Sequence, residues 1–69
     1  MGLHNKIFYN EASAVKLGWE PSWFGEDEFD EELILKIKEF QSKHDLEADG
    51  LCGPMTYRRK VTEREALAE

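Results

Sequence analysis

The chain has a single cysteine, Cys52, so it cannot form an internal disulfide. Only His4 and His44 accompany that cysteine, and the three residues do not have a zinc-ligand spacing, so we expect no metal and no cofactor. Long apolar runs are missing as well. No stretch approaches the length of a membrane span and no signal-peptide core follows Met1, so we expect no membrane partner.

Basic residues are scarce relative to acidic ones. The chain has 9 Lys and Arg against 15 Asp and Glu, which gives a formal net charge of −6 at pH 7. Because a phosphate-binding surface needs a net basic footprint, this balance argues against nucleic acid as a partner. A neutral or amine-bearing ligand suits it better. The densest acidic run, residues 26–32, is interpreted as the solvated entry to a helix.

A chain of 69 residues has room for one domain with one modest core. We divide it into an N-terminal arm, 1–11, a three-helix domain, 12–62, and a helical tail or start of a linker, 63–69. The arm is rich in apolar residues and is expected to lie extended across the bundle. Asn10 is expected to cap a short first helix that ends at Gly18. No helix stop signal follows near the C-terminus, which favours a module cut from a longer protein.

Residue spacing predicts two further helices. At about 100° per residue, six side chains within 33–44 fall in one stripe roughly 120° wide, the pattern of a half-buried helix. Asp30 is its expected N-cap, and Pro54 suits the first turn of the next helix. Trp19, in the loop before these helices, is expected to cover the core. The predicted fold class is all-α, a small three-helix bundle. The stripe consists of Leu33, Ile34, Ile37, Phe40, Gln41 and His44.

A compact turn joins these two helices, and we expect the rest of the chain to pack against it. Gly50 and Gly53 suit positive φ or a close approach of backbone. Gln41 lies at the edge of the buried stripe, where an unsatisfied amide is expensive, so it is expected to brace the turn through backbone groups. Asp49 is expected to accept an N–H bond from Leu51 or Gly53 and so hold the turn in shape.

The same stretch resembles a known sequence motif. It is similar to the pattern FQ…GL…DG…G…TW of the small three-helix peptidoglycan-binding domain of bacterial and phage cell-wall hydrolases, and upstream similarity extends the resemblance to roughly 12–61. Asp45 stands where the family usually has Gly, and Asp tolerates the left-handed conformation; Glu32 replaces the usual Thr. The residues that carry the resemblance are Leu17, Gly18, Trp19, Phe29, Asp30, Phe40, Gln41, Leu46, Asp49, Gly50, Leu51, Gly53, Thr56 and Tyr57.

The resemblance implies a non-catalytic module that binds peptidoglycan, through its glycan strand or its stem peptide. Such a module would anchor a fused catalytic domain, a cell-wall hydrolase such as a phage endolysin. It would act at the bacterial cell wall. With no signal peptide, it would be made in the host cytoplasm and released by lysis. The structural motif would be formed by Phe40, Gln41, Leu46, Gly50 and Gly53.

Five residues are candidates for ligand contact. Tyr57, where the family often has Trp, would lie against an aminosugar on the rim of a groove between the last two helices. Arg58 would pair with a stem-peptide carboxylate, or else remain solvated. Trp23 becomes a stacking candidate if its ring is exposed. Asp49 and Thr56 would either contact the ligand or hydrogen-bond locally.

Other functions stay open at this point. One is an acidic protein-interaction module on the same fold. Another is a degenerate calcium loop, because Asp45, Glu47 and Asp49 match the first, third and fifth EF-hand positions; Thr56, at position twelve, cannot supply the bidentate carboxylate. Cys52 lacks an orienting group for nucleophilic catalysis, and a chain this short has little room for a paired-acid cleft. We therefore expect no intrinsic enzyme activity.

Overall fold

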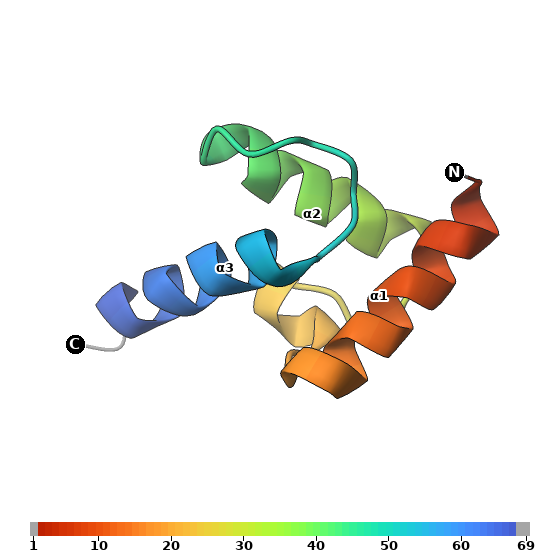
Figure 1. Ribbon diagram of the computed structural model, residues 1–69, viewed down its shortest axis with the longest axis horizontal. Coiled ribbons are helices and arrows are strands. Elements are labelled where there is room, and N and C mark those ends of the chain that lie inside the picture. Colours follow the sequence, from red (N-terminus) through yellow and green to blue (C-terminus); the bar gives the residue numbers. More distant parts are fainter. Residues whose placement is uncertain (1, 68–69) are drawn as a thin grey trace.

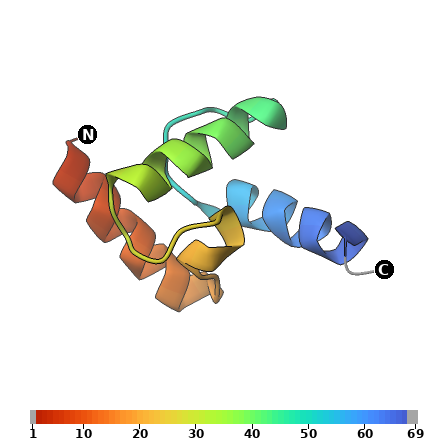
Figure 2. The same cartoon turned by 180° about the vertical axis from the view of Figure 1, so that it is seen from behind.

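The computed structural model describes residues 2–67, and within them the chain is all-helical, which confirms the predicted fold class. Its elements are α1 (Leu3–Leu17), the 3-10 turn η1 (Pro21–Phe24), α2 (Glu31–Lys43) and α3 (Pro54–Leu67). Figure 1 shows α1 crossing beside α2, with α3 leaving the junction of the two. Seen from behind in Figure 2, η1 and the loop before α2 cover the other side of that junction. No helix of the described part could cross a bilayer.

The first helix is longer than predicted. Residues expected to form an extended arm are the opening turns of α1, which begins at Leu3 rather than near Asn10. Asn10 is therefore not an N-cap: it lies in mid-helix with 1% of its surface exposed. The error has a physical cause, because a side chain that suits a cap also suits a buried site with hydrogen-bond partners. The predicted C-cap is right, since Gly18 has φ +89° and donates its N–H to Ala14.

The helix α2 begins and buries its stripe as predicted. Asp30 caps it by accepting the N–H of Leu33 at 3.0 Å. Five of the six stripe residues are buried and the sixth, His44, is half-buried. The chain then turns through Asp45, which has φ +58° and so adopts the left-handed conformation expected of it. The five buried residues are Leu33, Ile34, Ile37, Phe40 and Gln41.

Aromatic rings form much of the small core. Trp19 is 3% exposed, which confirms that it covers the core, and its ring meets Phe24 and Phe29 edge-on with centroids 5.7 Å apart in each pair. Phe24 in turn meets Phe40 at 5.8 Å. Edge-to-face pairs of this kind add about 0.5–1.5 kcal/mol beyond their buried area. η1 therefore fastens the α1–α2 connection to the buried face of α2.

Polar contacts dock α3 on α2. The Lys60 ammonium lies 4.9 Å from the ring centroid of Phe40 and 5.0 Å from that of Phe24, and it bonds Glu63 at 2.9 Å. Glu63 also lies 3.2 Å from Nε2 of His44 on α2. Hydrogen bonds from Lys60 and His44 lower the pKa of Glu63. The helix continues to Leu67, so the predicted helical tail is helical as far as the structure describes it; 68–69 lie outside the described residues.

Gly50 is the glycine that has the least room for a side chain. It has φ +78°, and a Cβ added to it would lie 2.6 Å from Cγ2 of Ile34. We expect Gly50→Ala to destabilise the fold by about 2–4 kcal/mol, since left-handed strain costs about 1–2 kcal/mol and overpacking adds to it. Urea unfolding would measure the change.

Gly18→Ala is the matched control for this substitution. Gly18 has φ +89° but nothing lies within 4 Å of an added Cβ, so only the backbone strain of about 1–2 kcal/mol is expected. Equal losses in the two variants would show that the contact with Ile34 does not constrain this position.

Candidate functional site

The turn between α2 and α3 is held by side chains rather than by a backbone ladder. Gln41, which is 1% exposed, accepts the N–H of Gly50 at 2.9 Å through Oε1. Its Nε2 lies 3.0 Å from each of three acceptors, the carbonyl of Leu51, Oδ1 of Asp49 and Oγ1 of Thr56, which share its two N–H groups. Asp49 Oδ1 also accepts the N–H of Leu51, as the sequence predicted. Gln41 thus has the bracing contacts expected of it.

A second set of side chains reaches the same turn from α1. Asn10 donates to the carbonyl of Gly50 at 3.1 Å and accepts the N–H of Cys52 at 2.9 Å. Ser13 donates to the carbonyl of Cys52 and accepts a bond from the indole of Trp19. Sequence reasoning missed this set. The available signal was the placement of polar residues at helical spacing on one side of α1, including Lys6, whose ammonium bonds the Asp49 carbonyl at 2.8 Å.

The held turn and the start of α3 enclose a hollow of about 360 Å³, which we call the loop hollow. Two of the predicted ligand residues, Asp49 and Thr56, line it. Tyr9 of α1 lines it too and was not predicted; its hydroxyl lies so close to Gly53 that a Cβ there would be 2.9 Å away. A side chain at Gly53 would displace the Tyr9 hydroxyl, so this glycine serves close approach and not positive φ. The lining residues are Tyr9, Gln41, Asp45, Leu46, Glu47, Asp49, Leu51, Gly53, Pro54, Met55 and Thr56.

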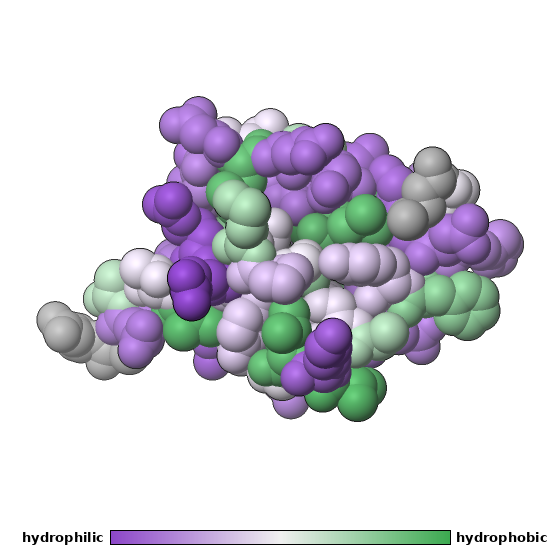
Figure 3. Space-filling model, viewed as in Figure 1, coloured by the Kyte–Doolittle hydropathy of each residue, from purple (hydrophilic) through white to green (hydrophobic). Residues whose placement is uncertain are grey.

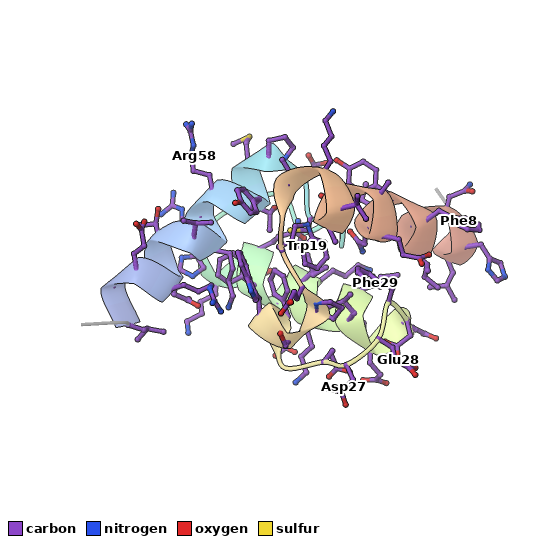
Figure 4. The ribbon with its side chains drawn as sticks, turned by 90° about the horizontal axis from the view of Figure 1, so that it is seen from below. Phe8, Trp19, Asp27, Glu28, Phe29 and Arg58 are labelled. Carbon is purple, nitrogen blue, oxygen red and sulfur yellow. The ribbon has the colours of Figure 1, made fainter. Side chains whose placement is uncertain are left out.

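A second hollow adjoins the first and shares Pro54 and Met55 with it; we call it the α3 hollow. It contains Tyr57 and Arg58, so Tyr57 lies beside the end of α1 and not at a groove between α2 and α3. On this face, weakly hydrophilic and hydrophobic residues gather around the start of α3 (Figure 3). Arg58 is exposed and points outward from α3 (Figure 4). The α3 hollow is lined by Leu17, Pro54, Met55, Tyr57, Arg58, Val61, Thr62 and Glu65.

Trp23, the fifth predicted ligand residue, is occupied by contacts within the chain. Its ring is stacked on Tyr57 with centroids 5.9 Å apart and an interplanar angle of 19°, and the guanidinium carbon of Arg64 lies 4.2 Å from its centroid. Tyr57 and Arg64 are two helical turns, or about 10 Å, apart, so the indole fits between them. These contacts occupy part of the half-buried Trp23 ring, which also lines a hollow between η1, α2 and α3. The Tyr57 ring is stacked on Trp23 through one face and keeps its other face for a ligand.

The geometry gives little support to the two alternatives, a nucleophilic cysteine and a calcium loop. Cys52 is 1% exposed, and burial raises the pKa of its thiol to about 12 against a smaller opposing effect of Lys60, so the nucleophilic thiolate is scarce at neutral pH. For calcium, one carboxylate oxygen of Asp49 already accepts two N–H bonds. Within residues 2–67, no group of three or more His, Cys, Asp or Glu is arranged to hold a metal ion.

Comparison with known protein families finds a match over most of the chain. The family described as "Putative peptidoglycan binding domain" matches residues 16–59. The matched range contains Gln41 and the whole turn that it braces, but it begins after Tyr9, Asn10 and Ser13 of α1. Searches of curated proteins and of solved structures each returned no match.

Replacing Gln41 tests whether the brace carries the stability of the turn. Gln41→Leu keeps a similar volume but removes the partner of the Gly50 N–H and of the buried Thr56 hydroxyl, whereas the carbonyl of Leu51 keeps the N–H of Gly53. We expect a loss of about 2–4 kcal/mol in the free energy of unfolding, because each buried unpaired group costs about 1–3 kcal/mol. Urea unfolding would measure this loss, and amide exchange at Gly50 would report the lost bond.

Ser42→Ala, at the neighbouring exposed position of α2, is the control and is expected to change stability by no more than about 0.5 kcal/mol. A loss below about 1 kcal/mol for Gln41→Leu would contradict the bracing role, since it would mean that water satisfies the turn as well as the amide does.

Proposed function

The chain belongs to the family of peptidoglycan-binding domains, and on that premise we propose that it is a non-catalytic anchor that holds its ligand in the loop hollow and the α3 hollow. Family membership implies peptidoglycan as the partner and the cell wall as the place of action. The proposal adds the position of the site, the role of individual residues and the attachment to a hydrolase.

One observation gives the strongest support to this position of the ligand site. The residues that the family shares with this chain, 16–59, include those whose hydrogen bonds give the loop hollow its shape. Within the described residues, no buried side-chain nitrogen or oxygen lacks a hydrogen-bond partner. A satisfied network of this kind holds the hollow in one geometry, and a preformed site loses less entropy when it binds.

The residues then have separate roles. Asp49 and Thr56 act as supports, because both bond to Nε2 of Gln41. Arg58 is exposed beside the α3 hollow and offers a guanidinium fork to a stem-peptide carboxylate. Tyr57 presents one ring face there. Tyr9, 38% exposed, supplies a ring and a hydroxyl to the wall of the loop hollow.

Retention on purified, insoluble sacculi tests the proposed site. We expect the unmodified chain to sediment with sacculi, and Tyr9→Ala and Arg58→Ala each to weaken binding roughly fivefold, equivalent to about 1 kcal/mol. Circular dichroism of each variant would show that the fold is intact.

Each of these variants has a matched control next to it in sequence. Phe8→Ala removes a more exposed ring, 67% exposed, from the same helix, and Arg59→Ala removes a neighbouring exposed charge from α3. Neither residue lines the two hollows. The site would be wrong if the controls weakened binding as much as the variants, and the anchoring role would be wrong if the unmodified chain stayed in solution.

We further propose that the chain anchors a cell-wall hydrolase, such as a phage endolysin released by lysis. Tethering raises the concentration of a catalytic domain near an insoluble substrate without adding chemistry. The support is indirect: Cys52, the candidate nucleophile, is buried, whereas the hollows suit binding.

A fusion to a wall hydrolase tests this second part. Deleting the chain from the fusion should slow hydrolysis of sacculi tenfold or more, roughly, while hydrolysis of soluble wall fragments stays unchanged. A fusion that carries Tyr9→Ala and Arg58→Ala should behave like the deletion. An equal loss on soluble fragments would instead mean that the chain supports the fold of the catalytic domain.

A further inference from the structure

The loop hollow has an apolar interior and an acidic rim. Asp45, Glu47 and Asp49 line it, and no Lys, Arg or His is among its lining residues. Asp45 and Glu47 are exposed and Asp49 is half-buried. The apolar walls come from Leu46, Leu51, Pro54 and Met55, with the ring of Tyr9. A ligand that enters this space meets carboxylates at its polar end and hydrocarbon along its length.

Within residues 2–67, no ion pair joins a carboxylate of this rim to a cation of the chain. Lys6 contacts the turn from α1, and its ammonium bonds the main-chain carbonyl of Asp49 at 2.8 Å. In the hydrogen bonds of residues 2–67, the carboxylate of Asp49 is engaged through Oδ1 alone. An exposed positive charge, Arg58, lines the adjoining α3 hollow, beyond the shared residues Pro54 and Met55.

Peptidoglycan offers few groups that fit this charge pattern. Its sugars are mostly neutral and its stem peptides carry carboxylates, which a protein of net charge −6 repels. The diamino acid of each stem, where it is not cross-linked, carries an ammonium at the end of a short hydrocarbon chain. That ammonium is the group that a carboxylate rim binds best, and the hydrocarbon matches the apolar walls.

We infer that the loop hollow binds the free side-chain ammonium of the stem-peptide diamino acid, while Arg58 in the α3 hollow pairs with a carboxylate of the same stem. This inference rests on the proposed function, and it makes the uncross-linked stem peptide, rather than the glycan strand, the group that the chain recognises. Recognition of both charges also gives the stem one orientation across Pro54 and Met55.

Chemical acetylation of the wall tests the inference directly. Acetic anhydride converts the free amines of sacculi to neutral amides and leaves the glycan and the carboxylates in place. We expect binding to acetylated sacculi to be about tenfold weaker than to mock-treated sacculi, the usual effect of losing a charge-assisted hydrogen bond. Equal binding to both would overturn the inference and leave the anchoring role intact. No binding to mock-treated sacculi would overturn the anchoring role itself.

A pair of charge-matched variants locates the effect in the chain. Asp45→Asn with Glu47→Gln removes two carboxylates from the rim, and Asn tolerates the φ of +58° at this position. Asp27→Asn with Glu28→Gln removes two exposed carboxylates from the loop before α2, which lies on the side away from Arg58 in Figure 4. Both changes bring the net charge from −6 to −4.

The rim variant should bind mock-treated sacculi about fivefold to tenfold more weakly and lose its sensitivity to acetylation. The loop variant should bind at least as well as the unmodified chain, because it is repelled less by the wall. A loop variant that lost as much binding as the rim variant would overturn the inference, since the effect would then follow net charge and not the hollow.

Competition with soluble ligands identifies the source of the amine. A stem tetrapeptide with a free diamino side chain should displace the chain from sacculi, and the same peptide acetylated at that amine should displace it about tenfold less well. A chitosan oligosaccharide carries its amines on the sugar and is expected not to compete. Competition by chitosan equal to that of the stem peptide would overturn the assignment to the stem.

Discussion

The backbone from Gly50 to Cys52 crosses the interior of the molecule without a helix or strand to pair with. Its polar groups are satisfied by two amide side chains, Gln41 from α2 and Asn10 from α1, with help from Ser13 and Asp49. Each such group left unpaired would cost about 1–3 kcal/mol, a large share of the stability of a small domain. The requirement to pair this short segment therefore determines where α1 and α2 must lie.

The position of α3 follows from the same constraint. Within the described part of the helix Thr56 is the one buried residue, and it is tied to the turn through Gln41. Beyond it, Lys60 of α3 lies over the Phe40 ring of α2 and Glu63 of α3 contacts His44, the C-cap of α2. The Trp23 ring stacks on Tyr57 and lies against Arg64, both of α3. A helix held largely by polar and aromatic contacts at one side leaves its start open to solvent. That open start, at Pro54 and Met55, separates the two hollows.

Sequence reasoning reached the α2–α3 half of this arrangement and not the α1 half. Asp30, Gly50 and Gln41 act within 16 residues of their partners, so spacing and turn chemistry identify them. The partners of Asn10 lie 40 and 42 residues away, and Tyr9 meets Gly53 across a similar separation. Trp23 could be recognised as an aromatic residue of the loop, but its contacts with Tyr57 and Arg64 depend on where α3 docks.

The amino-acid sequence by itself determined the helical class, the N-cap of α2, the C-cap of α1, the left-handed turn at Asp45 and the family motif, because these depend on local periodicity and on the conformational limits of single residues. The tertiary structure alone decided that α1 starts at Leu3, that its polar side chains hold the turn, and that Tyr57 and Arg58 share a hollow adjoining that of Asp49. The physical reason is that the type of a polar side chain shows only that it requires a hydrogen-bond partner when buried. Which partner it meets depends on how the helices pack.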